Sequence, residues 1–188
     1  HQQAPGLIQL GGKQLTVDGA SQDCVDWYLQ TVYQPHFERY RADFGKTIRG
    51  FFYDEPETPG DWGTELNRVL AERKVDWKKA YVAYKSQLAG EDQTAARYQY
   101  LDALAEAWGR TMYGGIARWC RQHGVKSTGH FMEHSKLYQH PEFCAGDMMR
   151  LQGHGDMGGI DAVFDQFVMG RRETRDAPCW QTPRLASS

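Results

Sequence analysis

Residues 47–56 have the sequence TIRGFFYDEP, in which an apolar run ends directly in two carboxylates and a proline. A short apolar run of this kind, bounded by turn-forming residues, predicts a buried strand over residues 47–53. Similar segments follow near residues 125–131 and 160–164, each after a predicted helix. Strands that alternate with helices are typical of a parallel α/β sheet. We therefore expect an α/β fold that is either a small open sheet or part of a barrel.

Apolar residues recur at helical spacing between these strands. The first helix is predicted to begin after Ser21 and to bend at Pro35, because proline removes a backbone hydrogen bond. The longest helix is predicted over about residues 93–123 and should end at Gly124. A short helix is expected near residues 147–151.

The first twenty residues are predicted to form a strand and a loop, since the apolar run 7–10 is followed by two glycines. With this segment included, residues 1–188 are expected to form a single domain, because a chain of this length is of ordinary domain size.

Asp54 and Glu55 follow the strand of residues 47–53 directly. Ligand chemistry in parallel α/β folds gathers at the carboxyl ends of the strands. Glycoside hydrolysis requires a carboxylic acid that donates a proton to the leaving oxygen, and apolar surroundings favour the protonated form. Glu55 is therefore a candidate catalytic acid. The alternative is that the two carboxylates cap the next helix or bind a structural cation.

A second polar segment, GHFMEH at residues 129–134, follows the next predicted strand. One interpretation makes His130 and Glu133 substrate contacts beside Glu55. Another is a zinc-dependent hydrolase, because His130, Glu133 and His134 match the H-x-x-E-H pattern of zinc peptidases. That pattern requires a helix so that both histidines share one face, whereas residues 127–129 favour a strand and loop.

The segment HGDMGGID at residues 154–161 combines glycines with two aspartates. It is either a cation-binding or substrate-facing loop or a flexible connection, and we favour the connection. The net charge of −2 provides no basic surface for nucleic acid or an anionic membrane, so neither is an expected partner. The four cysteines are widely spaced and indicate neither a zinc knuckle nor a disulfide framework.

Several segments together resemble the catalytic (β/α)8 TIM barrel of bacterial glycoside hydrolases of the broad clan A type, similar to the α-L-rhamnosidases. They are residues 44–56, 119–130, 146–150 and 159–161. The resemblance extends over most of the chain, from about residue 23 to the end. It implies that the chain is an internal fragment, a partial barrel with parallel strands near 47–53, 125–131 and 160–164.

In that family the acid glutamate ends the fourth strand and precedes a proline, often after an asparagine. Glu55 matches it, although Asp54 stands in place of the asparagine. The resemblance therefore implies that Glu55 is the general acid and that Asp54, His130 and Glu133 bind sugar hydroxyls. The partner carboxylate would end the seventh strand, beyond residue 188, and the isolated fragment would be inactive.

The same resemblance implies a carbohydrate substrate and a secreted or periplasmic location. Tyr53 and Trp62 would be aromatic walls against which a sugar ring packs. No cofactor is expected, although some relatives use calcium, for which Asp156 and Asp161 would provide suitable oxygens. A third hypothesis is a carbohydrate-binding or structural module without catalysis.

Overall fold

The computed structural model describes residues 7–10, 13–56, 62–86, 90–131 and 145–159. The strands are β1 (Leu7–Leu10), β2 (Lys13–Thr16), β3 (Gly50–Asp54) and β4 (Lys126–His130). The α-helices are α1 (Gln22–Tyr28), α2 (Gln34–Tyr40), α3 (Thr64–Glu72), α4 (Trp77–Ser86), α5 (Glu91–Trp108), α6 (Gly114–Gln122) and α7 (Met148–Gln152). Two π-helical turns, η1 (Leu29–Tyr33) and η3 (Gly109–Tyr113), and one 3-10 turn, η2 (Arg41–Asp43), complete the order.

β3 and β4 form a two-stranded parallel sheet, in which Gly50 is opposite Lys126 and Asp54 is opposite His130. The prediction of parallel strands in these two segments is thus confirmed. β3 begins three residues later than expected because a tight turn precedes it, in which the Gly45 N–H donates to the Ile48 carbonyl at 2.9 Å. The third predicted strand, residues 160–164, lies outside the described residues.

The described part of the chain is therefore a mixture of helices and strands with one parallel strand pair, and it shows no closed barrel. The predicted strand at residues 7–10 is present as β1. It pairs with β2 in a separate antiparallel hairpin, so it does not precede β3 in the parallel sheet.

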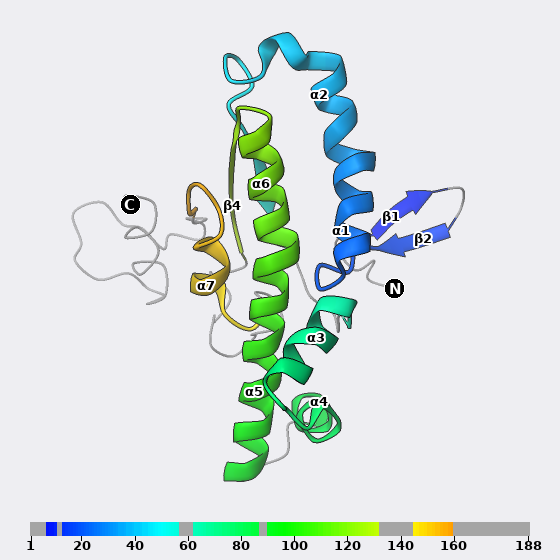
Figure 1. Cartoon of the computed structure of the whole chain (residues 1–188), viewed down its shortest axis with the longest axis vertical. Helices are drawn as coiled ribbons and strands as arrows, with labels where there is room; N and C mark the ends of the chain where they lie inside the picture. Colours follow the sequence, from blue (N-terminus) through cyan, green and yellow to red (C-terminus); the bar gives the residue numbers. More distant parts are fainter. Residues whose placement is uncertain (1–6, 11–12, 57–61, 87–89, 132–144, 160–188) are drawn as a thin grey trace, which may run out of the picture.

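Two long helical columns contain π-helical turns, as α1–η1–α2 and α5–η3–α6 (Figure 1). In the first column, η1 ends immediately before Gln34, and Pro35 occupies the first turn of α2. Proline is tolerated there because it has no N–H to donate. At the place where the sequence predicted a bend, a π-helical turn ends and α2 begins at Gln34, directly before Pro35. Among the described residues, no helix combines the length and the apolar composition that are needed to cross a membrane.

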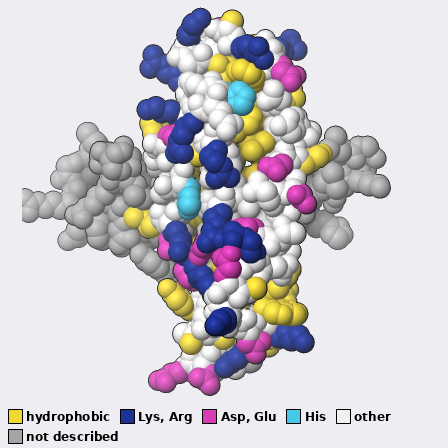
Figure 2. Space-filling model, viewed as in Figure 1, with side chains coloured by type: hydrophobic (Ala, Val, Ile, Leu, Met, Phe, Trp, Pro, Cys, Tyr) yellow, Lys and Arg dark blue, Asp and Glu magenta, His cyan; other side chains and the backbone are white. Residues whose placement is uncertain are grey.

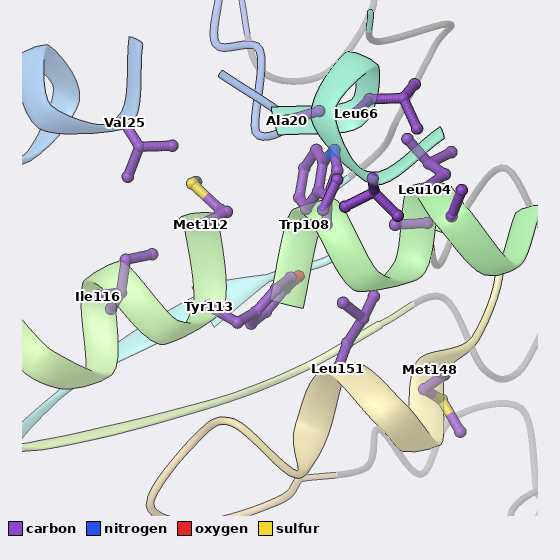
Figure 3. Packing of buried hydrophobic residues seen from close by; sticks show 14 of the residues in the cluster. Ala20, Val25, Leu66, Leu104, Trp108, Met112, Tyr113, Ile116, Met148 and Leu151 are labelled. Atoms are coloured by element: carbon purple, nitrogen blue, oxygen red, sulfur yellow. The ribbon is translucent and has the colours of Figure 1, made fainter. Parts of the chain in front are cut away.

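The hydrophobic core surrounds the α5–η3–α6 column (Figure 3). Trp108 is buried at its centre, with Leu66 of α3 on one side of the column and Leu151 of α7 on the other. The Trp108 ring lies against the backbone of Gly19, where an added Cβ would be 2.4 Å from the ring atom Cε2. Glycine is therefore required at residue 19 for this packing.

Ion pairs connect the outer helices to the same column, and charged side chains of both signs gather across the middle of the face shown in Figure 2. Arg73, which follows α3, pairs with Asp102 and Glu106 of α5. Arg150 of α7 pairs with Asp102 at 2.7 Å, and Arg110 of η3 pairs with Glu106. Exposed ion pairs each add little stability, but a network of this kind fixes α3 and α7 on α5.

Candidate functional site

The carboxyl ends of β3 and β4 bring Asp54 and His130 together. His130 Nε2 lies 2.9 Å from Asp54 Oδ1, and His130 Nδ1 lies 2.7 Å from the Phe131 carbonyl oxygen. The His130 side chain is only 7% exposed, whereas the Asp54 side chain is 77% exposed. The histidine is thus held rigidly within the protein, and the carboxylate beside it faces solvent.

Glu55 continues the strand pairing by one residue. Its backbone N–H donates to the His130 carbonyl at 3.2 Å, and its side chain is half-buried. Its φ of +41° lies in the left-handed region, which is uncommon for a residue with a side chain and is found at functional sites more often than elsewhere. The hydrogen bond to β4 fixes Glu55 at the edge where the two strands end, as the sequence predicts.

The two faces of the sheet have different surroundings. Phe52, Asp54 and His130 share one face, on which the Phe52 and His130 ring centroids are 5.8 Å apart. Tyr53 lies on the other face, with its ring centroid 4.9 Å from that of Tyr113 and 6.0 Å from that of Phe131. Tyr53 is therefore a packing residue of the core side, and this position does not suit a sugar-facing wall.

Trp62 belongs to an aromatic cluster on the helices. Its ring centroid lies 5.5 Å from that of Trp77 and 5.3 Å from that of Tyr81, and it stacks on Tyr100 at 6.0 Å. Its Nε1–H donates to Asn67 Oδ1 at 2.9 Å. These contacts explain Trp62 as part of the packing between α3, α4 and α5, so we do not include it in the site.

The structure describes only some of the remaining predicted site residues. Glu133, His134 and Asp161 lie outside the described residues. His130 is the last residue of β4, so the first histidine of the H-x-x-E-H pattern is in a strand and not on a helix. Within the described ranges, no group of three His, Cys, Asp or Glu side chains is placed to hold a metal ion.

Asp156 supports β4 from the loop that follows α7. Its Oδ2 accepts from the Ser127 N–H at 2.8 Å and from Ser127 Oγ at 3.2 Å, and its Oδ1 accepts from Arg121 Nε at 2.7 Å. Burial acts to raise the pKa of Asp156, but the hydrogen bonds from Ser127 and Arg121 outweigh it and lower that pKa. Both carboxylate oxygens thus have protein partners, and the segment is a docked loop, not the flexible connection that we expected.

The same loop is fastened at its other end by Gln152, which is buried. Gln152 Nε2 donates to the Gly159 carbonyl at 3.0 Å, and the Gly159 N–H donates to Gln152 Oε1 at 3.2 Å. Gly159 also touches β4, because an added Cβ would lie 2.5 Å from the Gly129 carbonyl oxygen. This loop therefore supports the strand residue that immediately precedes His130. The sequence analysis did not predict this role of Gln152.

The site that results is an edge with an acidic group, Glu55, next to a hydrogen-bonded Asp54–His130 pair. Carboxylates and an imidazole in this arrangement are suited to binding hydroxyl groups and to proton transfer. No model of a protein family, no curated protein and no solved structure matches this chain.

Proposed function

We propose that the chain forms part of the catalytic domain of a glycoside hydrolase, in which Glu55 is the general acid that protonates the leaving oxygen. The observation that carries this proposal is the location of Asp54 and Glu55 at the carboxyl end of β3, beside His130 at the end of β4. Catalytic groups of α/β enzymes are found at the carboxyl ends of neighbouring parallel strands, which is the place that Asp54 and Glu55 occupy.

In this proposal Asp54 binds sugar hydroxyls, and His130, which the sequence suggested as a second sugar contact, positions Asp54 because both of its ring nitrogens already face protein oxygens. The exposed Asp54 carboxylate accepts hydrogen bonds from a substrate, and the buried His130 ring holds it in place through the 2.9 Å contact. Glu133 is proposed as a further binding residue from the sequence alone. Within this framework a second carboxylate is still required as nucleophile or base, and we propose that it comes from beyond residue 188.

We also propose that β3 and β4 are neighbouring strands of a (β/α)8 barrel. The two faces of the sheet have different surroundings, and this difference supports the arrangement. Phe51 and Tyr53 face helices, while Phe52 and Asp54 are exposed on the opposite face. In such a barrel the helices cover the outside of each strand and the other face turns inward.

The test is a comparison of leaving groups in the full-length protein and its Glu55→Gln variant. A general acid matters most when the leaving alcohol is a poor one and matters little for an activated nitrophenolate. Glu55→Gln should therefore lower kcat/KM for alkyl glycosides by about 100-fold or more, and much less for dinitrophenyl glycosides. Glu38→Gln, an exposed change on α2, is the matched control.

Equal losses on both substrates would contradict the role of Glu55 as a proton donor. Unchanged turnover in Glu55→Gln would remove the residue from the mechanism. Activity that disappears with chelator and returns with zinc would favour the hydrolase based on His130, Glu133 and His134. Sugar binding without turnover would favour a non-catalytic module.

A further inference from the structure

The two π-helical turns have a feature in common, which is that each ends in a buried tyrosine. η1 ends at Tyr33 and η3 ends at Tyr113, and the two side chains are 5% and 2% exposed. In η3 the Gly114 N–H donates to the Gly109 carbonyl five positions earlier, and η1 ends with the same kind of bond. An α-helix spans only four positions, so each turn holds one extra residue. Such insertions are rare and are frequently found at functional sites.

Both tyrosines pack on β3, although they come from different helical columns (Figure 1). The Tyr33 ring centroid lies 4.6 Å from that of Phe51, and the Tyr113 ring centroid lies 4.9 Å from that of Tyr53. Phe51 and Tyr53 are alternate residues of one strand, so they share the face of the sheet that is turned toward the helices. The two π-helical turns therefore support β3 from behind at two successive positions of this face.

Tyr113 is the one of the two that lies behind the candidate site. Its neighbour Tyr53 directly precedes Asp54, and its second neighbour Phe131 directly follows His130, with a centroid distance of 5.2 Å. The Phe131 carbonyl is also the oxygen that faces His130 Nδ1 at 2.7 Å. A single ring thus contacts the residue next to each member of the Asp54–His130 pair.

The Asp54 side chain cannot be held by packing of its own, because it is 77% exposed. Its position, and that of Glu55 after it, depends on the backbone that Tyr53 fixes. Interiors are close-packed, so removal of a ring behind Tyr53 displaces this backbone. Tyr33 acts three residues earlier, through Phe51 and Trp119, where its ring centroid lies 5.3 Å from that of the tryptophan.

We propose that Tyr113 is a positioning residue for the proposed reaction, and that η3 places its ring behind Tyr53 and Phe131 in order to fix the edge that carries Asp54 and Glu55. Tyr113 does not touch the substrate in this arrangement and acts through the two strands. A displacement of about 1 Å at reacting groups can lower a rate by about 100-fold. This inference rests on the proposed glycosidase function and adds a residue to the same site.

The test compares three variants of the full-length protein. Tyr113→Leu should lower kcat for alkyl glycosides by about 10- to 100-fold, leave KM within about twofold, and affect dinitrophenyl glycosides less, because a displaced proton donor is the cause. Tyr113→Phe keeps the ring and should keep kcat within about twofold. Tyr33→Leu removes the same ring from the other π-helical turn and is the matched control. It should lower the unfolding midpoint as Tyr113→Leu does but should keep kcat.

Hydrogen exchange observes the same edge without any activity. The Glu55 N–H donates to the His130 carbonyl at 3.2 Å, so its exchange rate reports whether the two strands stay paired at their ends. Exchange of this amide should be at least about tenfold faster in Tyr113→Leu than in the parent, and unchanged in Tyr33→Leu. If Tyr113→Leu does not fold, Tyr53→Leu removes the other half of the contact and should give the same kinetic pattern.

Three outcomes would overturn the role of Tyr113. They are an equal loss of kcat in Tyr33→Leu, which would indicate general destabilisation, an equal loss in Tyr113→Phe, which would exclude ring packing as the cause, and parental kcat in Tyr113→Leu or in Tyr53→Leu. The proposed function fails separately. If Glu55→Gln leaves turnover unchanged while exchange at Glu55 still distinguishes Tyr113→Leu from Tyr33→Leu, the glycosidase proposal is wrong and the support of the strand ends by Tyr113 remains.

Discussion

His130 presents both of its ring nitrogens to oxygen atoms, Nε2 to Asp54 Oδ1 at 2.9 Å and Nδ1 to the Phe131 carbonyl at 2.7 Å. A neutral imidazole has a single N–H, and a backbone carbonyl only accepts. The contact between Nε2 and Asp54 therefore needs a further proton, carried either by the ring or by the carboxyl group. The pair lies at the ends of the two strands, next to Glu55.

Replacement of Asp54 by Asn removes the negative charge from this pair while keeping its shape. Because the Asp54 side chain is 77% exposed, we expect the free energy of unfolding to change by less than about 1 kcal/mol. A charged hydrogen bond to substrate would be lost, so kcat/KM should fall about 10- to 100-fold. Urea unfolding and steady-state kinetics measure the two effects, with Asp26→Asn on α1 as the exposed control. A large loss of stability with unchanged kinetics would show a structural role only.

Replacement of Gly129 by Ala tests the close approach of β4 to β3. An added Cβ would lie 2.2 Å from the Tyr53 carbonyl oxygen, so the strands would have to move apart. Overpacking of this kind costs typically about 1–3 kcal/mol, and backbone atoms cannot rotate away, so we expect at least the upper value. Gly155→Ala, whose added Cβ has its nearest neighbour at 3.5 Å, should unfold like the parent. If both variants unfolded at the same urea concentration, the close approach of Gly129 to β3 would be contradicted.

Asp156 should make stability depend on pH in the acid range. Its pKa in the folded protein lies below the ordinary value of 3.8, because the hydrogen bonds from Ser127 and Arg121 outweigh the effect of burial. The stabilisation is therefore complete well above pH 3.8 and is lost as the pH falls through the folded pKa. Asp156→Asn should lower the free energy of unfolding by about 1–3 kcal/mol at neutral pH. The free energy of unfolding of this variant should also decrease less steeply than that of the parent as the pH is lowered. Denaturation curves at several pH values measure this, and an unchanged acid slope would contradict it.

The strand pair could be predicted from the sequence because its pattern is local. The run from Phe51 to Tyr53 ends in charged residues, and Gly124 stops the helix before β4, so both strands and their parallel order follow from short segments. One interpretation of the sequence also placed His130 beside Glu55, since carboxyl ends of parallel strands meet at one edge, but the contact between His130 and Asp54 was not predicted. The (β/α)8 closure rests on strands that the described residues do not include.

Long-range contacts could not be predicted in the same way. Tyr53 and Trp62 were expected to face a sugar, but alternation along β3 turns Tyr53 toward Tyr113, and Trp62 packs on Tyr100. A single sequence shows that an aromatic residue is present, not which partner it meets. The contact of Asp156 with β4 was missed for the same reason, because its partner Ser127 is 29 positions away in the chain.

The order of assembly during folding follows from the connection between the two strands. Asp54 and His130 are separated by 76 positions, and α3, α4, α5 and α6 all lie between them. Pairing over such a distance carries a large loop-closure entropy, which is offset only after the intervening helices have formed. We therefore expect the edge that holds Glu55 to be completed late, after the helical column, so that early folding intermediates are helical but lack the assembled site.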